Sequence, residues 1–162
     1  MLVKGMQFMN WKKGFIVLFL LLFTMGLTAC TGENGDQTAK DGIQIEFNHP
    51  NQVSSGKMTE YSVKITKDNQ PIENAEVVVS LEMVQMDHGK NGFLGKMTEP
   101  GVYKGEAALP MNGEWYAYVR VKAGEVETTK SFTFEADGHM LNTDELEKIG
   151  LDKSGAKIDP NF

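Results

Sequence analysis

Residues 115–122 read WYAYVRVK, and every second side chain of this stretch is apolar. The apolar set is Trp115, Ala117, Val119 and Val121, and between them lie Tyr116, Tyr118, Arg120 and Lys122. Because successive side chains of a β-strand point to opposite faces of a sheet, this alternation predicts a strand with one face in the core and the other in water. The same period recurs on both sides of the stretch.

Further segments between Ile43 and Phe134 repeat the alternation. The positions on the core-facing side are 43, 45 and 47; 61, 63 and 65; 77, 79, 81 and 83; 103, 105, 107 and 109; and 126, 128, 132 and 134. Turn signals separate the segments at residues 69–71 (NQP), 100–101 (PG), 110–113 (PMNG) and 123–124 (AG), and residues 89–95 are expected to form a loop. Since no long helical pattern intervenes, the sequence predicts an all-β fold: an immunoglobulin-like antiparallel β-sandwich of six or seven strands across residues 42–136.

The last part of the chain, residues 137–162, is predicted to hold a short helix and a loose tail. Asn142 is a good N-cap residue, the acidic Asp144 and Glu145 follow it in the first turn, and Gly150 is a stop signal. Residues 151–162 show no periodic pattern. We therefore expect the tail to begin directly after the helix.

The first 29 residues have the features of a lipoprotein signal peptide. Lys4, Lys12 and Lys13 precede an apolar run, and the run ends in residues 27–30, LTAC, whose Cys30 is the chain's one cysteine. Cleavage before Cys30 would leave its sulfur carrying a diacylglyceryl group, so this thiol is expected to serve as a lipid anchor and not as a ligand. The alternative is an uncleaved membrane anchor, but residues 14–29 are shorter than the roughly 20 apolar residues of a spanning helix. Both interpretations place the following domain outside the cytoplasm, because the positive charges stay inside.

Residues 30–41 are predicted to be the lipidated Cys30 and a flexible tether, since residues 31–41 are polar, rich in glycine and without apolar periodicity. Without the three lysines of residues 1–29, 13 basic and 22 acidic side chains remain, which gives a formal charge of −9. This charge argues against nucleic acid as a partner. With no cysteine beyond Cys30, the domain must be stabilised by hydrophobic packing and not by disulfides.

The most chemically suggestive stretch is residues 83–89, MVQMDHG, where two thioethers and an imidazole leave the end of a strand together. Thioethers are good ligands for Cu(I) and poor ones for Mg²⁺ and Zn²⁺, and imidazole also suits Cu(I). Met83, Met86 and His88 are therefore candidate copper ligands. Met111 is a fourth candidate, because the loops of a sandwich gather at its ends and bring distant residues together. Weaker candidates are Met97, His139 and Met140.

The packing alternative remains open for these residues. Met83 is in register with the apolar positions 77, 79 and 81, and methionine is a common core residue. Catalysis finds little support in the sequence. Asp87 and His88 are adjacent in the chain and so do not face each other, no serine lies in an activating context, and there is no phosphate-binding glycine loop. We expect a protein that is not an enzyme.

Residues 69–121 resemble the YtkA-like family, which is related to FixH. The resemblance lies in the turn at residues 70–75 (QPIENA), the exit at 83–88 (MVQMDH), residues 100–103 (PGVY) and residues 109–115 (LPMNGEW). It implies a small exported sandwich domain associated with copper handling and respiratory oxidase assembly. It also implies that Met83, Met86, His88 and Met111 face a metal, whereas Gly101, Tyr103, Gly113 and Trp115 are structural. Where many members have a Met-x-Met step, this chain has Gln85 and Asp87 around Met86, and Asp87 would also suit Cu(II).

Two functions follow as hypotheses. The first is a lipoprotein, anchored in the membrane by Cys30, that binds copper and supplies it to a membrane protein such as a haem-copper oxidase subunit or a copper transporter. The second is an adaptor module without metal, which docks a membrane protein through a sandwich edge or through Tyr116 and Tyr118, with the methionines as packing.

Overall fold

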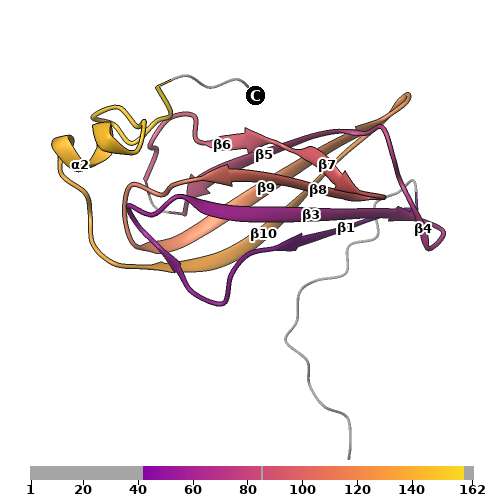
Figure 1. Ribbon diagram of the computed structural model, residues 1–162, viewed down its shortest axis with the longest axis horizontal. Helices are drawn as coiled ribbons and strands as arrows, with labels where there is room; N and C mark the ends of the chain where they lie inside the picture. Colours follow the sequence, from indigo (N-terminus) through magenta and orange to yellow (C-terminus); the bar gives the residue numbers. More distant parts are fainter. Residues whose placement is uncertain (1–41, 85, 159–162) are drawn as a thin grey trace, which may run out of the picture. The chain divides into compact units, whose positions relative to one another are not determined.

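The computed structural model describes residues 42–84 and 86–158, and these residues form two β-sheets packed face to face (Figure 1). All of the described residues belong to one compact unit. The predicted signal peptide, Cys30 and the tether lie outside the described residues. No helix in the described part is long and apolar enough to cross a membrane.

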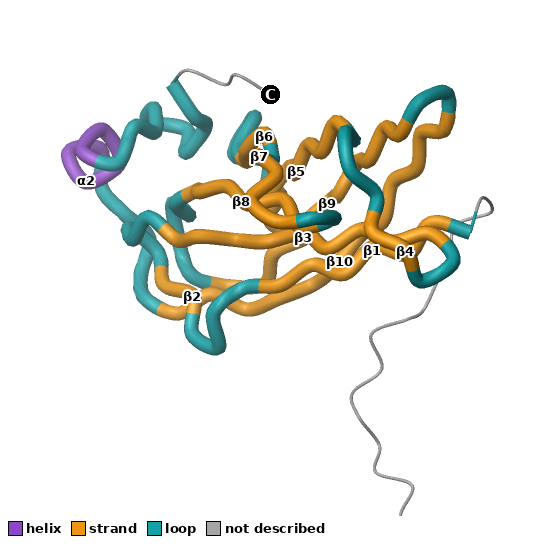
Figure 2. Tube along the Cα trace, turned by 45° about the vertical axis from the view of Figure 1, so that its right-hand side comes forward, coloured by secondary structure: helices purple, strands orange, loops and turns teal. Residues whose placement is uncertain are grey.

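Each sheet has five strands. One has the order β1 (Ile43–Asn48), β3 (Thr59–Lys67), β8 (Val102–Ala107) and β7 (Lys96–Glu99), with β4 (Gln70–Pro71) also paired to β3. The other has the order β2 (Val53–Ser54), β10 (Val126–Asp137), β9 (Gly113–Ala123), β5 (Glu76–Met83) and β6 (Gly92–Leu94). A short helix, α2 (Thr143–Lys148), follows β10 (Figure 2). The prediction of an all-β, largely antiparallel sandwich is confirmed.

The alternation read from the sequence forms the core between the sheets. Along β9 the apolar set from Trp115 to Val121 is fully buried, while the intervening side chains are partly or fully exposed. On β5 the residues Val77, Val79 and Leu81 are buried, and on β3 the same holds for Tyr61, Val63 and Ile65. Burying one such large side chain contributes roughly 1.5–3 kcal/mol, so the regular pattern accounts for a stable domain without disulfides.

Four short strands were not predicted. Three of them, β2, β4 and β6, have only two or three residues, and β7 has four, which is too few to show a period. The segment expected to be a loop, residues 89–95, contains β6, whose Phe93 is buried over Gly105. A Cβ atom at Gly105 would lie 2.1 Å from Cδ2 of this ring, so the strand needs glycine there. The pairing of β2 with β10 is parallel, in contrast to the other pairings.

Two further expectations need correction. The turn expected at residues 69–71 lies one residue earlier, because Asp68 and Asn69 both have positive φ angles and Gln70 and Pro71 already pair with β3. The tail expected to be loose from residue 151 is packed as far as residue 158. Leu151 is 2% exposed and forms a small apolar cluster with Leu141 and Leu146. The sequence pattern misses this cluster because its members lie five residues apart, a spacing that matches neither the period of a helix nor that of a strand.

The sandwich has two ends of different character. At the methionine end, on the left of Figure 1, β5 and β10 terminate and β3 and β9 begin. Five methionines lie there: Met58, Met83, Met86, Met111 and Met140. The opposite end, which we call the turn end, holds the β3–β4, β7–β8 and β9–β10 turns. The methionine end therefore collects loops from distant parts of the chain, as predicted from the sandwich topology.

Candidate functional site

The residues that leave β5 form a tight loop at the methionine end. The Val84 amide donates to the Glu114 carbonyl at 3.1 Å, which keeps the strand's exit beside β9. Further on, the Asp87 carboxylate accepts a hydrogen bond from the Gly89 amide at 2.8 Å, and Gly89 has a φ of +70°. This bond turns the chain back across the end of the sandwich. Asp87 thus shapes the loop that carries His88.

His88 is the centre of the candidate site. Its Nδ1 lies 2.9 Å from the Ser154 carbonyl oxygen, and its ring is stacked near Trp115, with ring centroids 6.0 Å apart and an interplanar angle of 24°. Its Nε2 is buried and has no hydrogen-bond partner among the described residues. A buried polar atom without a partner is costly and uncommon, so it needs a physical explanation.

The hydrogen bond to Ser154 decides the tautomer of His88. A carbonyl oxygen only accepts, so Nδ1 must carry the hydrogen and donate it. In the neutral ring Nε2 then holds a free lone pair. This is the nitrogen with which a histidine binds a metal when its other nitrogen donates to a carbonyl group. The arrangement at His88 fits such a ligand.

The two methionines of the predicted stretch flank this histidine. Met83, Met86 and His88 all line one pocket of about 640 Å³. Met83 is half-buried, packs against the main core and is paired across the sheet with Trp115. Its methyl carbon lies 2.7 Å from the position that a Cβ atom on Gly113 would take, so the glycine leaves room for the thioether. Met86 is 50% exposed and reaches the solvent.

Met111 approaches the same end from the turn between β8 and β9. It is partly buried and packs against the main core. The preceding Pro110 and His88 both face Gly155: a Cβ atom there would lie 2.9 Å from the Pro110 ring and 3.2 Å from His88 Nδ1. The turn that carries Met111 therefore lies beside the imidazole. The expectation that distant loops converge here holds for the position of this turn.

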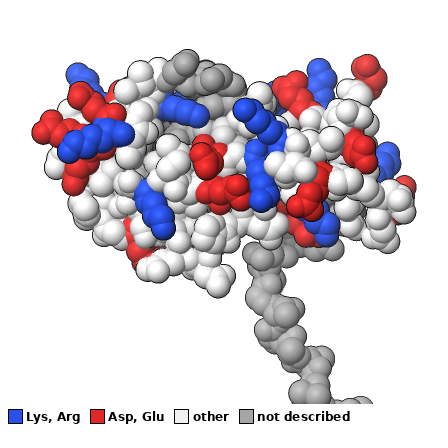
Figure 3. Space-filling model, viewed as in Figure 1, with Lys and Arg blue, Asp and Glu red and all other residues white. Residues whose placement is uncertain are grey.

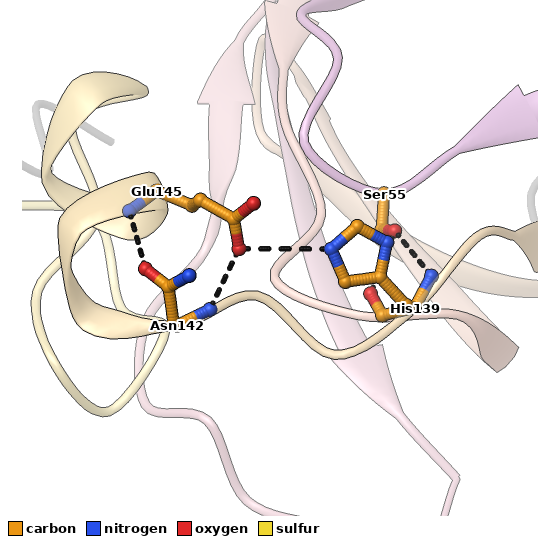
Figure 4. Close-up of polar contacts among 4 residues, drawn as sticks. All are labelled: Ser55, His139, Asn142 and Glu145. Carbon is orange, nitrogen blue, oxygen red and sulfur yellow. Dashed lines mark hydrogen bonds and ion pairs between the residues drawn. The ribbon is translucent and has the colours of Figure 1, made fainter.

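Of the weaker candidates, Met97 lies apart from this group, and His139 has other partners. Met97 is on β7 opposite Tyr103, nearer the turn end, and is 45% exposed. His139 turns toward α2, where its Nε2 lies 3.6 Å from the Glu145 carboxylate (Figure 4). Its backbone exchanges hydrogen bonds with the Ser55 hydroxyl. Met140, 64% exposed, follows at the methionine end.

The contact between His139 and Glu145 belongs to the cap of α2. The Asn142 side chain accepts from the Glu145 amide, and the Glu145 carboxylate accepts from the Asn142 amide, which forms a capping box (Figure 4). The hydrogen bond from the Asn142 amide is the main cause that lowers the pKa of Glu145, and His139 lowers it further. His139 therefore has a structural partner that the sequence did not reveal.

The pocket at His88 offers the thioethers of Met83 and Met86 and the imidazole of His88. In the described ranges, 42–84 and 86–158, no three His, Cys, Asp or Glu side chains come close enough to hold a metal ion. Acidic and basic residues lie interspersed over the face of the molecule shown in Figure 3. Ion pairs on the surface include Lys64 with Glu46 and Lys104 with Glu60. Thioether and imidazole donors are of the kind that soft cations prefer.

The sequence did not predict that three further residues lie at the methionine end or contact His88. Met58, 51% exposed, precedes β3 and was not singled out. Trp115 was assigned a structural role, but it also stacks near His88. Ser154 lies 66 positions from His88, so no local pattern could predict their contact. The signal that could have found Met58 is its place in a loop beside the start of a predicted strand.

Comparison with known proteins places the chain in a family. The model of the YtkA-like family matches residues 37–120, which is more than half of the chain. The chain belongs to the YtkA-like family. The resemblance seen in the sequence is thereby confirmed. No curated protein matches the chain. Among solved structures, a DUF4426 family protein from Pseudomonas aeruginosa PAO1 is similar, with 20% identity and a TM-score of 0.46, covering 58% of this chain and 89% of that one.

Proposed function

We propose that this YtkA-like domain binds Cu(I) at its methionine end, through His88 and the thioethers of Met83 and Met86, with Met111 as a further ligand. The observation that carries the proposal is the buried Nε2 of His88, which has a lone pair and no partner in the described structure. A metal ion would satisfy this atom. Thioether sulfur as the neighbouring donor favours cuprous copper over harder cations.

Export and lipidation belong to the same proposal. The signal features of residues 1–29 and Cys30 support a domain that is held at the outer side of the cell membrane by a lipid anchor. Copper bound there would be passed to a membrane protein such as a haem-copper oxidase subunit or a copper transporter.

Replacing Cys30 with serine is expected to release the protein from the membrane fraction, which fractionation and palmitate labelling measure.

A competition titration tests the copper site. The full chain, purified in detergent, is titrated with Cu(I) against a chromophoric chelator, alongside the variants Met83→Leu, Met86→Leu and His88→Phe. Leucine keeps most of the volume of methionine, and phenylalanine keeps a ring near Trp115, so folding is expected to survive. We expect one tight Cu(I) per chain in the wild type and a loss of roughly tenfold or more in each variant, about 1.4 kcal/mol per tenfold.

Met97→Leu is the matched control, because Met97 is nearly as exposed as Met86 but lies on β7, away from His88. Its copper affinity should equal that of the wild type. Trp115 offers a second readout, because it is the one indole of the chain's two that follows the proposed cleavage site before Cys30. Copper at His88 should quench its fluorescence, given the 6.0 Å between the two rings. Wild-type protein that is folded and takes up no Cu(I) would refute the proposal.

The adaptor hypothesis has one observation in its favour. Tyr116 and Tyr118 lie side by side on the outer face of β9, with ring centroids 5.7 Å apart, and tyrosine is enriched in protein interfaces. This hypothesis expects partner binding that is lost in Tyr116→Ala and Tyr118→Ala and unchanged in His88→Phe. Copper-dependent partner binding would favour the first function instead.

A further inference from the structure

The C-terminal strap, residues 151–158, lies across the loop that carries His88. The Lys157 amide donates to the Lys90 carbonyl at 2.8 Å, and the Lys157 ammonium lies 3.4 Å from the Gly92 carbonyl. Leu151 and Lys157 form an isolated antiparallel bridge, which closes the strap on itself. The strap is thus fixed to the loop on one side and to the small apolar cluster around Leu151 on the other.

Asp152 shapes the turn inside the strap. Its Oδ1 accepts hydrogen bonds from the Ser154 amide at 2.8 Å, from the Ser154 hydroxyl and from the Ala156 amide at 3.1 Å. The backbone of Asp152 adds two more, from its amide to the Ala156 carbonyl and from the Gly155 amide to its own carbonyl. These bonds lower the pKa of Asp152, which shows that the carboxylate form is the one that holds the turn.

The turn brings the Ser154 carbonyl to His88. Gly155 makes this approach possible: it has a φ of +88°, and a Cβ atom there would lie 3.2 Å from His88 Nδ1. On the other side, a Cβ atom on Gly89 would meet the Ala156 methyl carbon at 2.9 Å. Both glycines thus permit two backbones to close on the imidazole, and the Ser154 oxygen ends 2.9 Å from its Nδ1.

We propose that Asp152 and the Ser154 carbonyl are positioning residues for His88: by holding the hydrogen on Nδ1, the strap keeps Nε2 as the free donor atom for a soft metal ion. The inference rests on the proposed copper function for its consequence. The fixed tautomer itself is a property of the metal-free protein and can be tested without copper. Without the strap, the hydrogen would exchange between the two ring nitrogens, and the ring would lose its fixed orientation.

The first test is ¹⁵N NMR of the imidazoles in the metal-free full chain, labelled at histidine and purified in detergent. We expect His88 in the Nδ1–H tautomer in the wild type. In Asp152→Ala the turn loses its central acceptor, so His88 should show a mixture of tautomers. Its Cu(I) affinity should fall by about 10- to 100-fold, the usual cost of losing a group that orients a metal ligand.

Three variants control for a general structural effect. Asp152→Asn keeps an oxygen at the same position and should restore most of the tautomer preference and the copper affinity. Ser154→Ala keeps the carbonyl and removes one of the three hydrogen bonds to the Asp152 carboxylate, so it should weaken the tautomer preference less than Asp152→Ala does. Lys153→Ala changes an exposed side chain that takes no part in the hydrogen bonds of the turn in the described structure, and it should change nothing.

The outcomes separate the two proposals. A wild-type His88 with its hydrogen on Nε2 overturns the inference, and this measurement needs no variant to fold. An Asp152→Ala protein with wild-type tautomer and wild-type copper affinity overturns it as well. A wild type that shows the Nδ1–H tautomer, loses it in Asp152→Ala and yet binds no Cu(I) upholds the positioning role and refutes the copper function.

Discussion

The two ends of the sandwich are built by different means. At the turn end, backbone geometry closes short connections, and Tyr103 fixes the neighbouring segment: its hydroxyl donates to the Ile72 carbonyl at 3.1 Å and accepts from the Ala75 amide at 2.9 Å. The hydroxyl of Tyr103 thus has both a donor and an acceptor as partners. At the methionine end, longer loops connect the strands, and several large apolar side chains are exposed. Two buried nitrogen atoms, Nε1 of Trp115 and Nε2 of His88, have no hydrogen-bond partner in the described residues.

This difference suggests a division of roles. An end whose polar groups are paired among themselves contributes to stability, whereas an end that leaves buried donor and acceptor atoms unpaired bears a cost that a ligand, a partner or bound water would offset. The two ends share the same core, since Trp115 spans from the methionine end into the main cluster. Four substitutions test how separate the ends are.

The largest effect is expected from Trp115→Ala, which removes a fully buried indole from the main core. Loss of a buried tryptophan typically costs 3–5 kcal/mol in the free energy of unfolding, and chemical denaturation measures it. The variant would also lose the ring near His88. A cost below about 1 kcal/mol would mean that the methionine end is energetically independent of the core, contrary to the shared cluster.

Tyr103→Phe should have the next largest effect. It leaves the Ile72 carbonyl and the Ala75 amide without their side-chain partner, so we expect a loss of about 1–3 kcal/mol. Copper affinity should stay unchanged, because the hydroxyl contacts lie at the turn end. A drop in copper affinity without a change in fold would break the proposed division between the ends.

A smaller effect is expected from Asn142→Ala, which removes the N-cap of α2. Such caps contribute about 1 kcal/mol, and here the reciprocal bond to Glu145 would be weakened too. The loss should appear as faster amide exchange in residues 143–149, with strands β3 and β9 unaffected. Equal acceleration across the sheets would show that the helix and sandwich unfold as one unit.

The smallest effect is expected when the pH is lowered. The pKa of Asp152 is lowered in the folded protein, so its contribution to stability is complete above its ordinary value of 3.8 and is lost as the pH falls through the lower, folded value. Below pH 3.8 the amides of Ser154 and Ala156 should therefore exchange faster. The Asp152→Asn protein should lack this pH dependence, and equal behaviour of both proteins would assign the change to another group.

The long strands could be predicted because each carries at least three apolar residues in alternation, as in the stretch from Trp115 to Val121. The short strands could not, since β4 consists of Gln70 and Pro71 and has no period to detect. The strand-exit loop was predicted from its residue types. Its chemistry could not be completed, because the group that sets the tautomer of His88 comes from the backbone of Ser154, and backbone carbonyls leave no signature in a sequence.

Met83 shows a second limit. Its position in register with Val77, Val79 and Leu81 predicted a core residue, while its residue type suggested a ligand. The structure gives it both surroundings, since the side chain packs against the main core and also lines the pocket with His88. Sequence periodicity describes which face a residue occupies, but not what else reaches that face from the other loops.

The place where the chain enters the domain has a further consequence. Gly42 leads into β1 at the turn end, where Ile43 pairs with Lys67. The nine residues of β3 span the distance between the two ends, which is about 30 Å at roughly 3.3 Å per residue. If Cys30 anchors the chain, the tether joins the domain at the turn end, whereas the proposed copper ligands lie at the opposite end. A receiving protein would then have to reach the end of the domain that is not joined to the tether.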